Sequence, residues 1–362
     1  THVAMTVFRG AADDMKLQDW LFKRIFPMED KLDEHIVYVS SLLGMAEMLR
    51  RGTTSIIDMY FFCDSIAAAA EKIGLRTQIS RCITGDGHEA DMRIREAEEL
   101  FENYKDSRFV SVRPSAHAIY TCSASTLKKC ADMSERYGQG LYIHLAETKK
   151  ELEDCLNEHG LTPAAYLDSL GCLKQDTLLA HSVYVNDEDI ELIALRGSAV
   201  AHNPSSNLKL GSGIAPVMNM LSAGIPVALG SDGAASNNMQ NIFCEMRLAA
   251  LLQKGVQFAA DTVPANHAIK MATEYGARAM NMKDVGRIGP GMKADLILLD
   301  TGLPHMQPLT NAVSNIVYAA TGEEVYMTMV DGRIAYQNGS LLGIDTEDLY
   351  REANEIAKYI CR

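Results

Sequence analysis

The fold is decided by one stretch of sequence, Leu141-Tyr142-Ile143-His144-Leu145-Ala146-Glu147-Thr148. Its apolar run, with β-branched and aromatic members, lies between a glycine and a threonine that can cap a helix. This pattern predicts a covered parallel strand that ends in a histidine, with a carboxylate just beyond it. The chain repeats the pattern at Val112–His117, Leu178–His181 and Ser198–His202, and Val227–Asp232 ends in a carboxylate instead. Imidazoles and an acid at the carboxyl ends of successive parallel strands indicate a metal site.

Composition narrows the class of protein. A chain of 362 residues with 47% hydrophobic content can bury the core of one large domain and a smaller one. Its formal net charge of -13, without a basic stripe, argues against nucleic acid as a partner. No apolar stretch is long enough to span a bilayer, and no signal peptide is recognisable, so no membrane partner is expected. The eight cysteines lack C-x-x-C spacing, which is typical of reduced thiols in a cytoplasmic protein.

Short apolar runs alternate with amphipathic helical stretches as far as about residue 280. Such regular alternation predicts βα units and a parallel sheet. The first residues, Thr1-His2-Val3, have the character of the tail of an eighth strand. Seven further strands are expected at Thr53–Met59, Arg76–Ile83, Val110–His117, Leu141–Glu147, Thr177–Tyr184, Ser198–Pro204 and Val227–Asp232.

Eight units would close a (β/α)₈ barrel, and an open doubly wound sheet is the alternative. The histidines favour the barrel, because all eight strand ends of a barrel surround one mouth, whereas the outer strands of an open sheet could not share one ion. Helix caps are expected at Asp64, Thr148, Thr162 and Asn186, since each precedes an amphipathic stretch.

The pattern changes after Gly286. Short strands are expected at Leu296–Leu299, Glu324–Val330 and Arg333–Gln337, followed by a final helix over Asp345–Tyr359. So few strands are not stable alone and must pack on the larger domain. We therefore divide the chain into a barrel, residues 1–285, and a small β-rich part, residues 286–362.

Five of the ten histidines lie at predicted strand ends: His2, His117, His144, His181 and His202. One buried histidine is usually a core residue with satisfied hydrogen bonds, but five placed this way are harder to explain as chance. Asp232 could cap a helix, or it could bind an ion and take a proton from water. Glu147 could be a solvated acid in the first turn of a helix, or a second proton carrier beside the metal. Together the two acids supply a base for the water and an acid for the ring nitrogen, which hydrolysis at an amidine carbon requires.

Four further residues each have two interpretations. Trp20 is either a core residue or part of a binding site. Glu29 is either an ordinary acid at the start of a helix or part of the same site. Arg81 and Arg93 could both be surface charges. Arg81 lies near a predicted strand end, however, and could therefore point into the mouth of the barrel. The motifs of P-loop proteins, of serine hydrolases and of cysteine-ligated zinc deaminases are missing from the sequence.

The sequence resembles the amidohydrolase superfamily, and within it the branch of 5′-methylthioadenosine / S-adenosylhomocysteine deaminases. The similarity runs nearly end to end and is specific for the superfamily, but triazine hydrolases and guanine deaminases share most of the motifs. The stretches that carry it are Thr1–Met5, Leu141–Glu147, Ala201–Gly211, Leu229–Asn238 and Gly286–Asp300.

The resemblance implies a (β/α)₈ barrel flanked by a β-sandwich built from both chain ends, with one divalent ion, usually zinc. His2 matches the second histidine of an H-x-H pair, and His144 and Asp232 match two further metal ligands. The first histidine of that pair would lie upstream of residue 1, so we expect the chain to be a truncated form that lacks one ligand and the upstream sandwich strands. His117 stands where members with two metals have a bridging lysine, which implies a single ion.

The resemblance also implies roles in catalysis and in substrate binding. Asp232 corresponds to the base, Glu147 to the group that protonates the ring nitrogen, and His181 to the residue that hydrogen-bonds the attacking water. Substrate contacts are implied for Trp20, Glu29, Arg81, Arg93 and His117, with Glu29 accepting from two sugar hydroxyls and arginine binding a carboxylate.

Hydrolytic deamination of an adenine nucleoside, S-adenosylhomocysteine, 5′-methylthioadenosine or adenosine, is therefore the expected function. The alternatives are another hydrolase of aromatic C–N or C–Cl bonds and a barrel that has lost catalysis and serves as a scaffold. The preferred nucleoside, the identity of the metal and the oligomeric state, a homo-oligomer included, stay open at this point.

Overall fold

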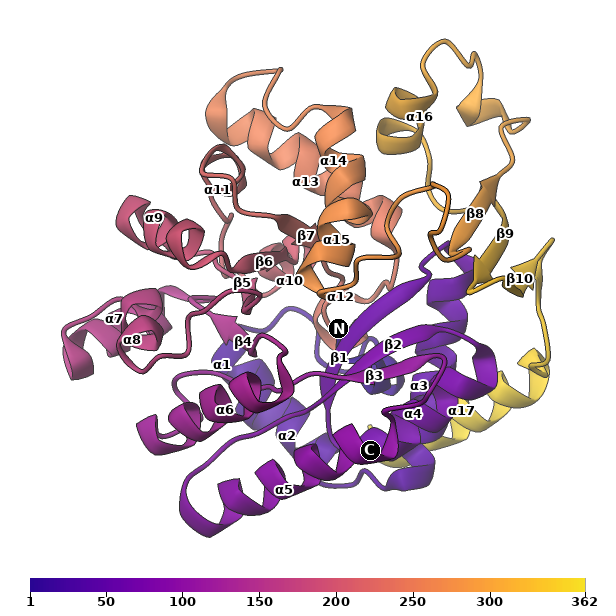
Figure 1. Cartoon of the computed structure of the whole chain (residues 1–362). Helices are drawn as coiled ribbons and strands as arrows, with labels where there is room; N and C mark the ends of the chain where they lie inside the picture. The colour runs from indigo at the N-terminus through magenta and orange to yellow at the C-terminus, as the bar shows by residue number, and fades with distance from the viewer. Residues whose placement is uncertain (362) are drawn as a thin grey trace.

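Parallel strands form a barrel in this computed structural model, which describes residues 1–361. One group of strands has the order β1-β2-β3 and the other the order β4-β5-β6-β7 (Figure 1). The two groups meet where the Tyr142 N–H donates to the Pro114 carbonyl and the Ala116 N–H donates to the Tyr142 carbonyl. The strands are β1 (Ser55–Tyr60), β2 (Arg76–Arg81), β3 (Val110–Val112), β4 (Tyr142–Leu145), β5 (Leu178–His181), β6 (Ala199–His202) and β7 (Val227–Leu229).

Thr1 lies in the remaining gap between β1 and β7. Its nitrogen donates to the Ile57 carbonyl, and its carbonyl accepts from the Met59 N–H. Its hydroxyl donates to the Asp232 carbonyl at 2.8 Å, just beyond β7. The predicted eighth position of the barrel is therefore occupied, although residues Val3–Phe8 continue as a 3-10 helix, η1, rather than as a loop after a strand.

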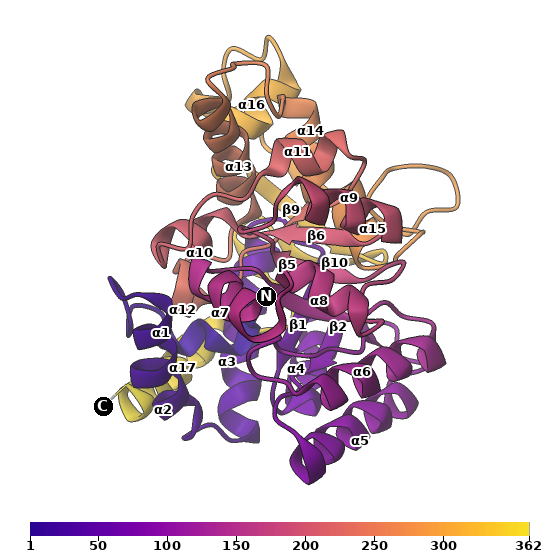
Figure 2. The same ribbon diagram turned by 90° about the vertical axis from the view of Figure 1, so that its left-hand side faces the viewer.

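Helices follow the strands and cover the outside of the barrel (Figures 1 and 2). Three predicted caps are confirmed, because the side chains of Thr148, Thr162 and Asn186 accept backbone N–H groups at their helix starts. The helices up to residue 279 are α1 (Leu17–Trp20), the π-helix η2 (Leu21–Ile25), α2 (Phe26–Glu29), α3 (Glu34–Arg50), α4 (Cys63–Ile73), α5 (Gly87–Asn103), α6 (Ala124–Tyr137), α7 (Lys149–His159), α8 (Pro163–Ser169), α9 (Asp187–Arg196), α10 (Pro204–Lys209), α11 (Val217–Ser222), α12 (Ala234–Asn237), α13 (Ile242–Gln257), α14 (Ala265–Ala272) and α15 (Glu274–Ala279).

Two local predictions were wrong. Helix α4 begins at Cys63 after a left-handed residue, Phe62, so Asp64 lies inside its first turn and accepts from the Tyr104 hydroxyl instead of capping the helix. The strand expected over Val110–His117 ends at Val112. Pro114 follows, and because proline has no N–H it cannot continue a ladder of strand hydrogen bonds.

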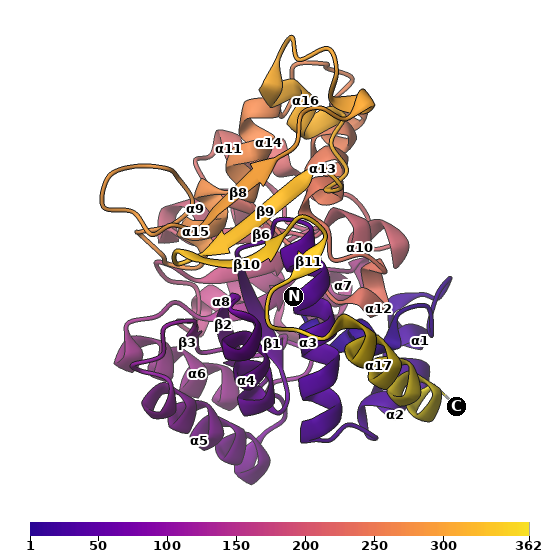
Figure 3. The ribbon, with the colours of Figure 1, turned by 90° about the vertical axis from the view of Figure 1, so that its right-hand side faces the viewer.

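A second, antiparallel sheet follows the barrel, with the order β11-β10-β9-β8 (Figure 3). Three of its strands agree closely with the predicted ones, the fourth, β11, was not predicted, and the final helix α17 packs against α3. The division of the chain at residues 285 and 286 stays a prediction. The elements are β8 (Leu296–Leu299), the 3-10 helix η3 (Pro304–Met306), α16 (Ala312–Tyr318), β9 (Val325–Val330), β10 (Arg333–Gln337), β11 (Ser340–Leu341) and α17 (Thr346–Ile360).

A buried ion pair joins the small sheet to the barrel. The Arg76 guanidinium, at the start of β2, donates from Nε and Nη2 to the two oxygens of Asp295 at 2.7 and 2.9 Å. The Asp331 N–H also donates to Asp295, at 2.7 Å. Arg76 is only 5% exposed, and a buried pair of this kind leaves an uncompensated charge if one partner is removed.

All eight cysteines are free thiols, and six of them are buried, as expected from their spacing. Among residues 1–361, no helix combines the length and apolar character needed to cross a bilayer.

Arg113, immediately after β3, is completely buried and donates mainly to backbone carbonyls rather than to carboxylates. Its acceptors are Gly140 at 2.7 Å, Ala279 at 2.6 Å and Asp176. Burial lowers the pKa of Arg113 to about 10. The side chain therefore connects the segments that precede β4 and β5 with the end of α15.

Arg113→Met should lower the free energy of unfolding by about 3 kcal/mol or more, since each buried carbonyl left without a donor costs about 1–3 kcal/mol. The matched control is Arg136→Met, which removes an exposed ion pair with Glu98 and should cost less than about 1 kcal/mol. Thermal melting of both variants measures the difference. Equal melting temperatures would contradict the role of Arg113.

Candidate active site

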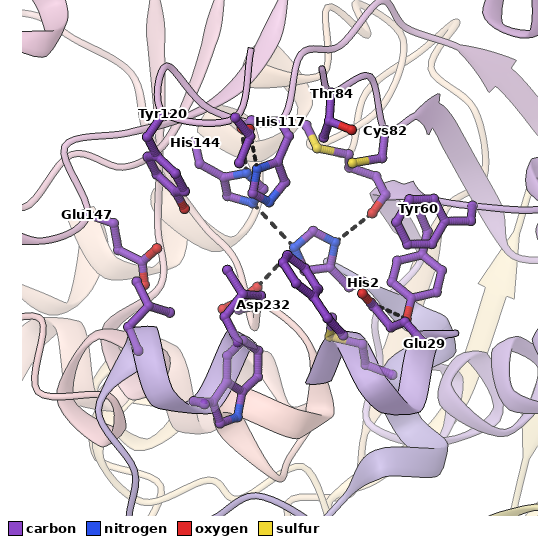
Figure 4. A pocket seen from close by; sticks show the side chains of 18 of the residues that line it. His2, Glu29, Tyr60, Cys82, Thr84, His117, Tyr120, His144, Glu147 and Asp232 are labelled. Atoms are coloured by element: carbon purple, nitrogen blue, oxygen red, sulfur yellow. Dashed lines mark hydrogen bonds and ion pairs between the residues drawn. The ribbon is translucent and has the colours of Figure 1, made fainter. Parts of the chain in front are cut away.

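A cavity of about 460 Å³ opens at the carboxyl ends of the barrel strands (Figure 4). Cavities of this size accommodate small organic ligands. Its wall combines apolar side chains, such as Met5, Leu17 and Phe26, with titratable ones. Most of the predicted site residues line it: His2, Trp20, Glu29, Arg93, His117, His144, Glu147, His181 and Asp232.

His2, His144 and Asp232 point toward one another in the middle of this cavity (Figure 4). The Nε2 atoms of His2 and His144 lie 3.3 Å apart, and His2 Nε2 lies 3.5 Å from Asp232 Oδ1. Residues that are more than 140 positions apart in sequence thus converge, as expected for the mouth of a barrel.

Backbone contacts determine which nitrogen of each imidazole carries the proton. His2 Nδ1 donates to the Met59 carbonyl at 2.6 Å, and His144 Nδ1 donates to the His117 carbonyl at 2.8 Å. Burial lowers the pKa of both histidines, so the rings are neutral. The two Nε2 lone pairs therefore face each other, an arrangement that is unfavourable unless a cation lies between them.

These donors fit a divalent metal ion. Two ligands of a tetrahedral zinc ion, each about 2.0–2.1 Å from the metal, lie roughly 3.3 Å from each other, close to the observed separations. No group of three or more His, Cys, Asp or Glu side chains within residues 1–361 closes around an ion by itself. The three side chains are thus a partial ligand set of suitable chemistry.

Asp232 is held by two hydroxyl groups. Ser206 and Ser236 each donate to Oδ2, at 2.6 and 2.7 Å, so that Oδ1 faces His2. Burial opposes ionisation of Asp232, but His2, His181 and the two hydroxyls together hold the pKa of its carboxyl well below the usual value. The alternative role of helix cap is not observed, since the cap residue of α12 is Gly233.

Glu147 and His181 form the second part of the titratable cluster. Burial raises the pKa of Glu147, which favours a protonated carboxyl group. His181 Nε2 lies 3.9 Å from Glu147 Oε2, and its Nδ1 lies 2.8 Å from the side-chain oxygen of Asn207. Burial alone would lower the pKa of His181, but the carboxylates of Glu147 and Asp232 raise it above the usual value.

Glu29 lies on the opposite side of the metal-ligand cluster from Glu147 (Figure 4). The Tyr60 hydroxyl donates to Glu29 Oε1 at 2.7 Å, and burial raises the pKa of Glu29 to about 7. Trp20 is 5% exposed, and its indole N–H has no partner among residues 1–361. Burial, together with His2 and His181, lowers the pKa of His117 to about 4, so this ring is neutral as well.

Two residues that the sequence singled out do not line this cavity. Arg81 does not line the cavity: its Nε donates to Glu96 at 2.6 Å, because side chains alternate along β2 and the next residue, Cys82, is the one that faces inward. His202 at the end of β6 is fully buried but does not line the cavity either. Arg93 does reach the cavity, where Thr84 and Glu89 hold its guanidinium.

Ser206, Ser236, Tyr60 and Asn207 were not identified from the sequence. Ser236 had a local signal, since it follows Asp232 by four residues, the spacing of neighbours on one helical turn. The others contact their partners only through the tertiary structure.

The chain belongs to the amidohydrolase family, whose sequence pattern matches residues 1–335. It is 42% identical over 360 residues to a 5-methylthioadenosine/S-adenosylhomocysteine deaminase of Caldicellulosiruptor saccharolyticus, a match that covers 99% of this chain and 83% of the relative. It is 44% identical to the enzyme of the same name from Desulfovibrio desulfuricans, with 100% and 83% covered.

Solved structures agree with the barrel. An adenosine deaminase from Xanthomonas campestris with bound zinc superposes with a TM-score of 0.96 at 33% identity, covering 99% of this chain and 83% of that one. Atrazine chlorohydrolase from Arthrobacter aurescens, complexed with zinc, gives a TM-score of 0.92 at 20% identity and covers 99% and 86%. At this lower identity the second match supports the fold alone. The predicted (β/α)₈ barrel with a small second sheet is thus confirmed.

Proposed function

We propose that this protein hydrolyses the exocyclic amino group of an adenine nucleoside, with S-adenosylhomocysteine, 5′-methylthioadenosine or adenosine as substrate. The products are ammonia and the corresponding inosine-type nucleoside. The observation that carries the proposal is the cavity itself, in which two facing imidazole lone pairs and Asp232 lie between a protonatable Glu147 and a buried Glu29. The names of the relatives point to the same reaction.

One divalent ion, zinc, is the cofactor that we assign to this cavity. His2 and His144 would hold it through Nε2, and Asp232 through Oδ1, with a further histidine upstream in the family pattern. When bound, such an ion lowers the pKa of water toward neutrality and so supplies a hydroxide nucleophile.

The protein's own residues move the protons of the reaction. Asp232, ionised because its pKa is low, accepts a proton from the attacking water. Glu147, whose raised pKa favours the protonated form, donates its proton to the ring nitrogen next to the amino-bearing carbon. His181 orients the water through Nε2 while Asn207 holds its Nδ1. The proton on Asp232 then passes to the amino group, and the C–N bond breaks as ammonia leaves. The proton that remains on the newly bound oxygen passes to Glu147, which gives the carbonyl group of the inosine-type product and restores the protonated acid.

The remaining side chains of the cavity bind the substrate. Glu29 accepts from the two adjacent sugar hydroxyls, and Trp20 and His117 pack against the nucleoside. Burial of these groups excludes water from the reacting carbon, which strengthens the electrostatic interactions in the site.

Ammonia release tests the proposal directly. Zinc-loaded protein is incubated separately with adenosine, 5′-methylthioadenosine and S-adenosylhomocysteine, and with guanine and a chlorotriazine for the alternative activities. Release from at least one adenine nucleoside, lost after chelation and restored by zinc, is expected. Release only from guanine, chloride release from the triazine, or no turnover at all would refute the assignment.

Arg93 and Arg81 provide a matched pair for tail recognition. We expect Arg93→Gln to raise KM for S-adenosylhomocysteine about tenfold, through loss of a charge-assisted contact to its carboxylate, without affecting 5′-methylthioadenosine. Arg81→Gln should leave both KM values unchanged, because its guanidinium binds Glu96 outside the cavity. Equal effects of the two substitutions in steady-state assays would contradict this difference.

A further inference from the structure

Helix α7 contains a buried acid, Glu151, that does not line the catalytic cavity. It is 4% exposed, whereas Glu153 and Asp154 on the same helix are exposed and pair with lysines. Its Oε1 accepts from the Ala146 N–H at 2.8 Å, and its Oε2 accepts from the Glu147 N–H at 2.9 Å. Both carboxylate oxygens are thus used on two consecutive peptide groups.

This arrangement differs from an ordinary helix cap. Thr148 caps α7 and accepts from the Glu151 N–H at 3.2 Å, so Glu151 occupies the third helical position. In a capping box that side chain would return to the N–H of the cap residue. Here it extends past the cap to the two residues before it, and thereby anchors the turn that carries Glu147.

The anchored turn is strained. Ala146 has φ of +48°, a left-handed conformation that costs a non-glycine residue roughly 1–2 kcal/mol. Its carbonyl accepts from the Val183 and Tyr184 N–H groups at 3.1 and 2.9 Å. The turn is therefore held on one side by Glu151 and on the other by the segment that follows β5.

The side chain of Glu147 has little to hold it in place. Its side-chain polar contacts among residues 1–361 are with Ser212 Oγ at 3.5 Å and His181 Nε2 at 3.9 Å, both longer than a good hydrogen bond. Its position in the cavity consequently depends on its backbone, which is the part that Glu151 binds.

We propose that Glu151 is a positioning residue for Glu147, and that its two backbone contacts keep the strained turn in the geometry that presents the Glu147 carboxyl to the ring nitrogen of the substrate. The proposal rests on the deaminase function above. A misplacement of about 1 Å can cost 10²-fold in rate, so loss of the anchor should affect turnover rather than substrate binding.

Glu151→Gln is the test variant. The amide oxygen of glutamine can still accept from one of the two backbone N–H groups, but its NH2 group faces the other N–H and repels it. We expect kcat to fall roughly 10- to 100-fold, with KM within about threefold and the zinc content unchanged. Glu153→Gln, an exposed change on the same helix, should have no effect. If Glu151→Gln does not fold, Glu151→Asp keeps the charge on a shorter side chain and should show a partial loss.

A double-mutant cycle separates positioning from general damage. If Glu151 acts through Glu147, adding Glu151→Gln to Glu147→Gln should cause no further loss of kcat. Two losses that multiply would overturn the proposal. Hydrogen exchange of the peptide that contains the Ala146 and Glu147 amides gives a readout independent of turnover: faster exchange in Glu151→Gln is expected, and unchanged exchange would refute the anchor even if the protein had no deaminase activity.

Discussion

Asp232→Asn should lower kcat for ammonia release by about 10³-fold or more while the chain still folds. The amide oxygen of asparagine can still accept from Ser206 and Ser236, so the local structure is kept. The amide cannot take up a proton from water, and it is a weaker ligand for a cation than a carboxylate.

The measurement is steady-state kinetics together with the zinc content of each preparation, so that loss of metal and loss of the base are distinguished. Asp13→Asn is the matched control, since it removes a carboxylate that pairs with Lys209 at the surface. A kcat within tenfold of the unmodified protein would show that Asp232 is not the base.

Glu147→Gln should reduce kcat by about 10²–10⁴-fold, with little change in zinc content. Glutamine can still form a hydrogen bond to the ring nitrogen, but it cannot deliver a proton to it. Because burial raises the pKa of Glu147, the acid form is present below that raised pKa and is lost as the pH rises through it. The unmodified protein should therefore lose activity on the alkaline side.

Profiles of kcat/KM against pH test whether Glu147 is the proton donor. The alkaline decline that belongs to Glu147 should be absent in Glu147→Gln and present in Glu153→Gln, whose side chain is exposed on α7. If kcat/KM declined in the same way at alkaline pH in all three proteins, a group other than Glu147 would be the proton donor.

Much of the fold could be predicted from local pattern. Strand β4 and the caps Thr148, Thr162 and Asn186 depend on apolar runs and short-range hydrogen bonds, which are encoded within a few residues. The failures are also local in origin. Phe62 adopts a left-handed conformation that nothing in its side chain favours, and so the start of α4 was misplaced.

Predictions for the site depended on which face of each strand a residue occupies. Arg81 and His202 are the last residues of β2 and β6, and each has an immediate neighbour, Cys82 or Asn203, that faces the interior. Strict alternation would have placed both outside the cavity. Tyr60, Ser206 and Asn207 lay beyond sequence reasoning, because what they do depends on partners brought near only when the barrel closes.

The Arg76–Asp295 pair makes residue 285 a poor place to cut the gene. A fragment ending there would delete the carboxylate that Arg76 binds. It would also expose the apolar side chains of the barrel that share a core with Val325, Val330 and Tyr336 of the small sheet, at a cost of about 25 cal/mol for each Å² exposed. A design that transfers the barrel to another protein should therefore include the small sheet.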